Sequence, residues 1–127
     1  MLKNKDSSAI VAVSDLARAR EFYAGTLGLK AEADSSEEDV LTFRTGRTSL
    51  IVYRSDEAGS NRANAAVWGV GDELDDIAAA LKAKGVAFEH YPDMEGIEID
   101  GDVHVAGDMR LVWFKDPDGN ILHLNNM

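Results

Sequence analysis

The chain has 127 residues, of which 45% are hydrophobic, and its formal net charge is −10, from 23 Asp and Glu against 13 Lys and Arg. This length suits one compact domain and is too short for two of ordinary size. A charge of this sign argues against binding to nucleic acid and would attract basic ligands, although it also serves solubility alone.

The composition also bears on where the protein works. Cysteine is absent, so neither disulfides nor thiolate chemistry is available. No apolar run approaches the ~20 residues of a membrane span, and residues 1–6 are too polar for a signal peptide. We therefore expect a cytoplasmic protein that binds neither a membrane nor nucleic acid.

The first elements along the chain are a strand and a helix. Residues 8–13 form a short apolar strand candidate, and apolar side chains then recur at helical spacing over residues 16–27. Asp15 suits the N-cap, because its carboxylate can accept hydrogen bonds from amides of the first turn. Gly28 suits the end of the helix.

A hairpin completes the first half of the chain. Residues 40–44 and 48–53 are apolar strand candidates on either side of a turn that contains Gly46. Residues 55–64 are polar, and we interpret them as the link to a second half.

The second half repeats the first. Residues 65–70 are a strand candidate, and residues 74–81 have helical spacing and precede a glycine. A shift of 57 residues superposes identical residues, namely Val13 on Val70, Asp15 on Asp72, Gly28 on Gly85 and Glu32 on Glu89. We predict one domain of two β-α-β-β-β modules, at about 7–54 and 64–126, because neither could bury its apolar face alone.

The strongest local signal is Asp-Pro-Asp-Gly-Asn at residues 116–120, between two apolar stretches. Proline pre-sets φ at one turn position and glycine supplies a positive φ, so this segment predicts a hairpin over residues 111–124. Strand alternation then places His123 on one face and Leu122 and Leu124 on the other. We place the candidate site at the imidazole of His123.

These motifs together resemble the vicinal oxygen chelate superfamily, which includes glyoxalase I, extradiol dioxygenases, and fosfomycin- and bleomycin-resistance proteins. The resemblance rests on residues 13–16, Arg18, residues 22–23 and 27–29, and residues 114–120. It covers nearly the whole chain. It implies an α+β fold of two tandem modules whose mixed sheets curl around a cavity, usually in a homodimer.

Metal-dependent members of that superfamily take ligands from inward-facing strand positions. On this chain the resemblance places those positions at Ser8, Leu50, Ala65 and His123. Only the imidazole binds a transition metal well, whereas catalytic sites usually have about three protein ligands. We therefore expect no metal and no other cofactor.

The same resemblance and strand alternation predict residues that line a small-molecule cavity. A neutral imidazole offers one donor and one acceptor, so His123 suits a hydrogen-bonding anchor or a general base, against the alternative of a satisfied buried histidine. Trp113 suits a planar or cationic ligand, with core packing as the competing explanation. The predicted ligand-binding residues are Ser8, Ile10, Thr42, Leu50, Ala65, Val67, Leu111, Trp113 and His123.

Residues 93–108 are acidic and lack the spacing of an EF-hand. We expect a solvated loop that could close over the cavity, and His104 would join His123 only if this loop folded inward.

Three functions remain open. The first is a metal-free small-molecule-binding protein, closest to the bleomycin-resistance type, that sequesters a cationic or aromatic compound. The second is a metal-dependent lyase, isomerase or dioxygenase with an atypical divalent-metal site made of His123, His104 and an acid from residues 93–108. The third is a protein whose sheets serve assembly alone. We favour the binding protein and predict no catalytic residue other than His123, should the protein be an enzyme.

Overall fold

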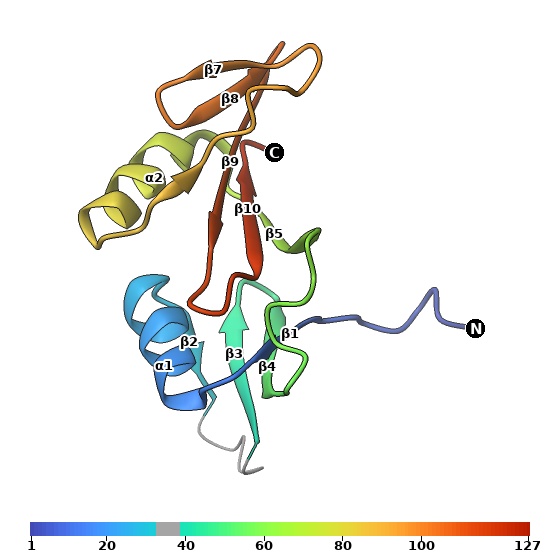
Figure 1. Cartoon of the computed structure of the whole chain (residues 1–127). Helices are drawn as coiled ribbons and strands as arrows, with labels where there is room; N and C mark the ends of the chain where they lie inside the picture. Colours follow the sequence, from blue (N-terminus) through green and yellow to red (C-terminus); the bar gives the residue numbers. More distant parts are fainter. Residues whose placement is uncertain (33–38) are drawn as a thin grey trace. The chain divides into compact units, whose positions relative to one another are not determined.

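The computed structural model describes residues 1–32 and 39–127. It divides into two compact units, unit 1 (Met1–Asn61) and unit 2 (Arg62–Met127), each built on its own mixed sheet (Figure 1). The fold class is α+β with curled mixed sheets, as predicted. None of the helices in the described residues is long and apolar enough to cross a membrane.

Unit 1 follows the predicted strand, helix and three strands. Its elements are β1 (Ala9–Val13), α1 (Leu16–Arg20), the π-helix η1 (Glu21–Thr26), β2 (Lys30–Ala31), β3 (Val40–Thr45) and β4 (Thr48–Arg54). The strands are ordered β1-β4-β3-β2, with β1 parallel to β4 and the other pairs antiparallel. Gly28 and Gly46 have positive φ, +74° and +54°, as the predicted helix end and turn require.

The helix of unit 1 begins where the sequence predicts it. The Asp15 carboxylate accepts a hydrogen bond from the Arg18 amide at 3.1 Å, which confirms the N-cap. Its second part is a π-helix, in which the Leu27 amide donates to the Phe22 carbonyl at 2.9 Å. Apolar spacing alone does not distinguish a π turn from an α turn, so the π-helix could not be predicted from the sequence.

One face of the unit 1 sheet packs against α1. Its buried residues, together with those of the helical segment, are Val11, Val13, Ala19, Tyr23, Leu41, Phe43, Leu50 and Val52. Residues paired in register share a face, so Ile10, Thr42 and Ile51 lie on the opposite face. We call this second face the open face of unit 1.

Unit 2 repeats the plan with a longer middle section. Its elements are β5 (Asn64–Gly69), the 3-10 helix η2 (Gly71–Glu73), α2 (Leu74–Ala83), β6 (Phe88–Glu89), β7 (Glu98–Asp100), β8 (Val103–Ala106), β9 (Met109–Lys115) and β10 (Ile121–Asn125). The strands are ordered β5-β10-β9-β8-β7, and β6 also pairs with β9. Only β5 and β10 are parallel.

Two predictions for unit 2 are wrong. Residues 93–108 are not one loop, because β7 and β8 pair as a hairpin and β8 pairs with β9. The acidic side chains Glu98 and Asp100 are exposed on a short outer strand, and they concealed its alternation with Ile99. The 57-residue shift also predicts Asp72 as the N-cap of the second helix, by analogy with Asp15, but Asp72 lies inside η2 and α2 begins only at Leu74.

The predicted C-terminal hairpin is confirmed. β9 and β10 pair antiparallel, and Gly119 in the turn has a φ of +90°. The buried Asp116 carboxylate accepts hydrogen bonds from the Asp118 amide, the Asn120 amide and the Asn120 side chain at 2.9, 2.9 and 2.8 Å. This carboxylate therefore fixes the turn from which β10 starts.

One face of the unit 2 sheet is covered by α2 (Figure 1). The buried apolar residues of this side are Ala66, Leu74, Leu81, Val103, Val112, Phe114, Leu122 and Leu124. The register places His104, Leu111, Trp113, His123, Val67 and Asn125 on the other face. We call it the open face of unit 2.

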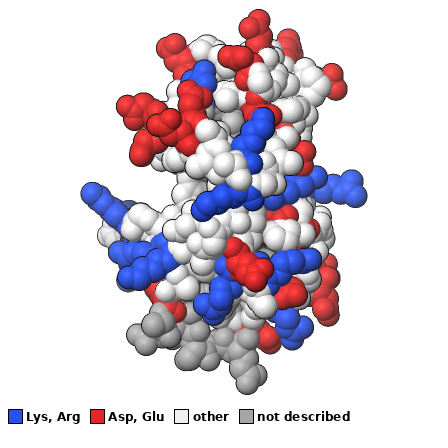
Figure 2. Space-filling model, turned by 90° about the vertical axis from the view of Figure 1, so that its left-hand side faces the viewer, with Lys and Arg blue, Asp and Glu red and all other residues white. Residues whose placement is uncertain are grey.

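Charge is distributed unequally between the units. Residues 62–127 carry 13 Asp and Glu against five Lys and Arg, a formal charge of −8, whereas residues 1–61 carry ten against eight, a formal charge of −2. On the face drawn in Figure 2, acidic side chains gather over α2 and the β7–β8 hairpin. Most of the net negative charge of the chain therefore belongs to unit 2.

Candidate functional site

Unit 1 contributes four of the predicted ligand-binding residues. Ser8 is exposed just before β1, and Ile10 is 60% exposed on the open face. Thr42 is half-buried and pairs with Ile51 on that face. Leu50 lies on the opposite face, 1% exposed against α1, so it is a core residue. Because side chains alternate along a strand, Ile51 holds the open-face position next to it.

The sheet of unit 1 offers no side chain that suits a transition metal. Strands β1, β2, β3 and β4 contain no His, Cys, Asp or Glu. Their polar groups are hydroxyls, a lysine and two arginines, and hydroxyls are poor ligands for such ions. Unit 1 therefore provides a largely apolar surface with hydrogen-bonding hydroxyls.

Unit 2 contributes the other five predicted residues, all outside its α2-covered face. His123 pairs in register with Val67 on one side and with Trp113 on the other. Leu111 pairs with Asn125 and His104 in the next row, and Ala65 lies at the bulge of β5. The structure thus brings Val67, His123 and Trp113 together, with Leu111 in the row beside them.

Trp113 belongs to an aromatic cluster made by unit 2 itself. Its indole stacks on the His123 ring, with centroids 4.7 Å apart and planes 20° apart. Tyr91 and His104 meet the indole nearly perpendicularly at 5.4 and 4.8 Å. The indole N–H donates to the Asn64 side-chain oxygen at 3.0 Å, and Trp113 is only 7% exposed. A ligand therefore meets little of the flat indole surface in this arrangement.

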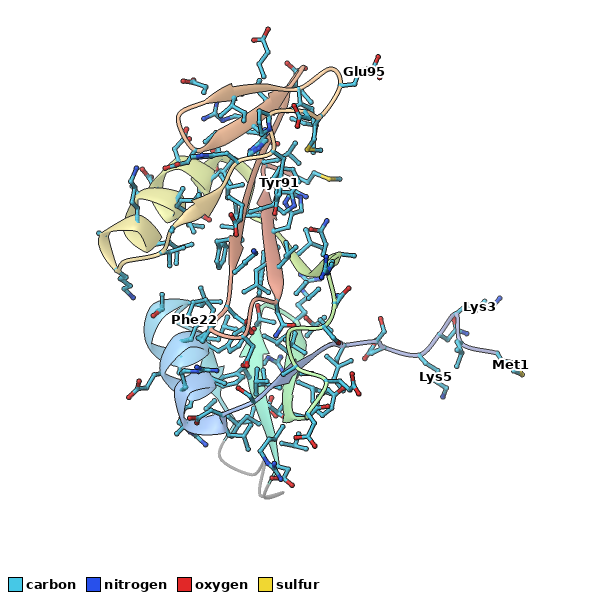
Figure 3. The ribbon with its side chains drawn as sticks, in the orientation of Figure 1. Met1, Lys3, Lys5, Phe22, Tyr91 and Glu95 are labelled. Atoms are coloured by element: carbon cyan, nitrogen blue, oxygen red, sulfur yellow. The ribbon has the colours of Figure 1, made fainter. Side chains whose placement is uncertain are left out.

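The labelled side chains in Figure 3 show the limits of this cluster. Tyr91 lies beside β9 and β10, whereas Glu95, on the loop that follows, points away from the sheet. The Glu89 side chain, which lies opposite Trp113, pairs with Lys115 at 3.2 Å. The cluster is thus bordered by a neutralised ion pair.

His123 is a neutral hydrogen-bonding group with two assigned partners. Its Nδ1 lies 3.1 Å from the Val112 carbonyl, so Nδ1 carries the proton and donates. Its Nε2 accepts from the Asn125 amide nitrogen at 3.4 Å. Burial lowers the pKa of His123, and the Val112 carbonyl only partly opposes this. The ring is therefore uncharged at neutral pH.

His104 lies on the same face, which the sequence did not predict. It is fully buried, and its Nε2 accepts a hydrogen bond from the Tyr91 amide at 2.9 Å. Within the described part of the chain its Nδ1 has no hydrogen-bond partner. Burial lowers the pKa of His104, as does the nearby His90. The alternating pattern of β8 could have indicated that His104 faces inward, but the acidic residues around this strand favoured a loop.

The atypical metal site of the enzyme hypothesis is not formed within unit 2. That site requires His123, His104 and an acid together, but the Trp113 indole lies between the two imidazoles and contacts both. Across residues 1–32 and 39–127, no three His, Cys, Asp or Glu side chains come together in a way that could hold a metal ion. Among the described residues, this set of side chains therefore does not fit a divalent metal.

The model of the Glyoxalase/Bleomycin resistance protein/Dioxygenase superfamily matches residues 7–124 of this chain. The chain therefore belongs to this superfamily, and the predicted family is confirmed. No curated protein matches the chain in sequence.

Solved structures share the fold over almost their whole length. The fosfomycin resistance protein FosX from Listeria monocytogenes has a TM-score of 0.73 at 17% identity, over 99% of this chain and 92% of that one. An integron cassette protein, HFX_CASS4, from the Halifax Harbour sewage outfall metagenome has a TM-score of 0.71 at 20% sequence identity. The match covers 98% of this chain and 99% of that one. TnmS3, an antibiotic binding protein from Streptomyces sp. CB03234, has a TM-score of 0.68 at 26% sequence identity. The match covers 98% of this chain and 97% of that one.

Proposed function

We propose that this protein is a metal-free member of its superfamily that binds and sequesters a cationic or aromatic small molecule. The observation that carries the proposal is the state of the candidate metal positions. Ser8, Leu50 and Ala65 are unsuited to a transition metal, so His123 is left as a single suitable ligand where a catalytic site usually has about three. A scaffold with one such imidazole supports binding better than metal-dependent catalysis.

The similarity to TnmS3 supports the same function. That protein is described as antibiotic-binding, and it is similar to this chain over nearly the full length of both. A small organic ligand is therefore the kind of molecule that the scaffold accommodates, and we carry this over to the present chain as part of the proposal.

The surfaces of the two open faces suit a partly apolar ligand. Ile10 and Val67 are 60% and 59% exposed, which is high for such large aliphatic side chains. The −8 charge of unit 2 would draw a cationic compound toward it. We propose the cytoplasm as the compartment and a homodimer as the working form, which sedimentation equilibrium would test.

A thermal-shift screen with basic aromatic compounds tests the proposal. A compound that binds only the folded protein raises its stability, by about 2.7 kcal/mol when present at 100 times its dissociation constant. We expect such compounds to raise the melting temperature of the wild type and of His90→Ala, whose side chain is exposed, and to act more weakly on His123→Ala. A screen without any stabilising compound would contradict the proposed function.

A further inference from the structure

The Val112 carbonyl of β9 determines which ring nitrogen of His123 carries the proton. The Val112 carbonyl can only accept, so the ring nitrogen that faces it at 3.1 Å, Nδ1, carries the proton. A neutral imidazole has one N–H, so the lone pair of His123 is on Nε2. The backbone of the neighbouring strand thus selects one tautomer.

Asn125 selects the same tautomer from the other side. Its amide oxygen accepts a hydrogen bond from the Met127 backbone N–H at 3.2 Å. This orientation turns the amide nitrogen toward His123, where it faces Nε2 at 3.4 Å. An amide nitrogen can donate but not accept, so Nε2 must be the acceptor. Two independent contacts therefore agree on one protonation pattern.

The contact between Asn125 and His123 is replaceable. At 3.4 Å it is longer than the usual range for an N–H donor, so it satisfies Nε2 only weakly. On the β9 side the ring is covered by Trp113, but on the β5 side its neighbour Val67 is 59% exposed. His123 and Asn125 are each only 8% exposed, and the Met127 carbonyl and the Asn125 side chain fill the space beside Gly69. A ligand therefore reaches Nε2 only by displacing the Asn125 amide, next to the exposed Val67.

We propose that Asn125 is a positioning residue that holds His123 as a hydrogen-bond acceptor, and that the ligand of this face carries an N–H or O–H donor that replaces the Asn125 amide. The ligand-class part rests on the proposed function, whereas the role of Asn125 stands on the geometry alone. A polar donor on a planar apolar ligand would satisfy Nε2 and meet Val67 at the same time. A ligand that offers only acceptors would face the Nε2 lone pair without a partner.

Imidazole nitrogen NMR on histidine-labelled protein tests the role of Asn125. In the wild type we expect His123 to be neutral with its proton on Nδ1, and a proton on Nε2 would overturn the proposal. In Asn125→Asp the introduced carboxylate favours the charged ring, so the His123 titration midpoint should rise by about 1–3 pH units. A midpoint and tautomer identical to the wild type would show that Asn125 is merely structural.

Two further variants separate positioning from folding. Asn125→Leu removes the donor without adding charge, and the minor tautomer should become about two- to tenfold more populated. Asn126→Asp is the matched control, because Asn126 bonds the Arg110 amide and the Asp108 carbonyl instead of His123. A change in His123 in this control equal to that in Asn125→Asp would also overturn the proposal.

Indole and 1-methylindole form the pair of probes for the ligand class, since they differ in one N–H donor. We expect indole to bind at least about fivefold more tightly and to shift the Nε2 signal of His123. Indole binding no better than 1-methylindole, including no binding of either, would overturn the ligand class. Equal binding of both probes would overturn the ligand class but not the proposed function. A compound screen without a hit would contradict the proposed function but not the positioning role of Asn125.

Discussion

At the residue scale, three buried polar side chains of unit 2 form hydrogen bonds with backbone groups. His104 accepts from the Tyr91 amide, and His123 donates to the Val112 carbonyl. Asp116 accepts three hydrogen bonds inside its own turn. Each of these groups keeps its hydrogen bonds in only one protonation state or with one side-chain shape. Substitutions and changes of pH that remove these bonds should therefore lower the free energy of unfolding.

Acid should destabilise the protein through the two buried histidines. Their pKa values lie below the ordinary value of 6.5, because burial disfavours the charged ring. Their contribution to the free energy of unfolding is therefore complete above pH 6.5 and is lost as the pH falls from there through the lowered pKa values. Urea unfolding between pH 7.5 and 5 should show this loss.

Histidine variants test whether His104 causes this pH dependence of the free energy of unfolding. In His104→Gln the introduced amide can still accept from the Tyr91 backbone but does not titrate, so the loss of stability between pH 6.5 and 5 should become smaller. His90→Gln, at an exposed position, should retain most of the loss, because burial, the larger cause of the lowered pKa of His104, is unchanged. A wild-type free energy of unfolding that is constant down to pH 5 would contradict the neutral state of these rings.

Removing the Asp116 carboxylate should destabilise the β9–β10 turn. Asp116→Ala leaves two backbone amides and the Asn120 side chain without their acceptor, and we expect a loss of about 2–3 kcal/mol. Denaturant unfolding measures this loss, with the exposed Asp93→Ala as the control. A loss below that of the control would show that the turn does not depend on this carboxylate.

At the element scale, strong turn chemistry made most of the fold predictable from sequence. The β9–β10 hairpin and the helix N-cap at Asp15 follow from residues whose hydrogen bonds the structure then shows. The π-helix and the β7–β8 hairpin were missed. A π turn has the same apolar spacing as an α turn at short length, and β7 is a three-residue strand with two exposed acids.

In addition to the pairing of β8 with β9, the β7–β8 hairpin contacts α2 and His90 through the Asp102 carboxylate. Asp102 lies 2.8 Å from His90 and 3.0 Å from Lys82 of α2, and these hydrogen bonds lower its pKa. Asp102→Asn should reduce the free energy of unfolding by about 0.5–1 kcal/mol at neutral pH, more than Asp100→Asn on the exposed edge of the same hairpin. Equal effects in the two variants, measured by urea unfolding, would contradict this fastening.

At the scale of the whole molecule, the sequence predicted the family and the neighbours Val67 and Trp113 of His123, but not the inward position of His104. The register of β8 places His104 beside Trp113, and Leu50 turned out to be a core residue because its predicted position was one residue away from the open face. A shift of one residue exchanges the two faces of a strand, and residue counting cannot resolve that difference. The hydrogen bond between Asn125 and His123 could not be predicted without coordinates.

The uneven charge leads to a prediction for binding. If the −8 charge of unit 2 steers a cationic ligand, binding of a basic aromatic compound should weaken between low and physiological salt, because exposed charges are screened beyond about 8 Å at 0.15 M. Binding of a neutral aromatic compound should stay unchanged. Tryptophan quenching follows both, and salt-insensitive binding of the cation would contradict the role given to charge.

The most direct test of the account is the dissociation constant of a stabilising compound, measured by calorimetry on untagged protein before and after treatment with EDTA. Metal-free binding predicts the same constant in both, with no stoichiometric transition metal in the purified protein. Binding that is lost with EDTA and restored by one equivalent of a divalent metal, in the wild type but not in His123→Ala, would contradict it.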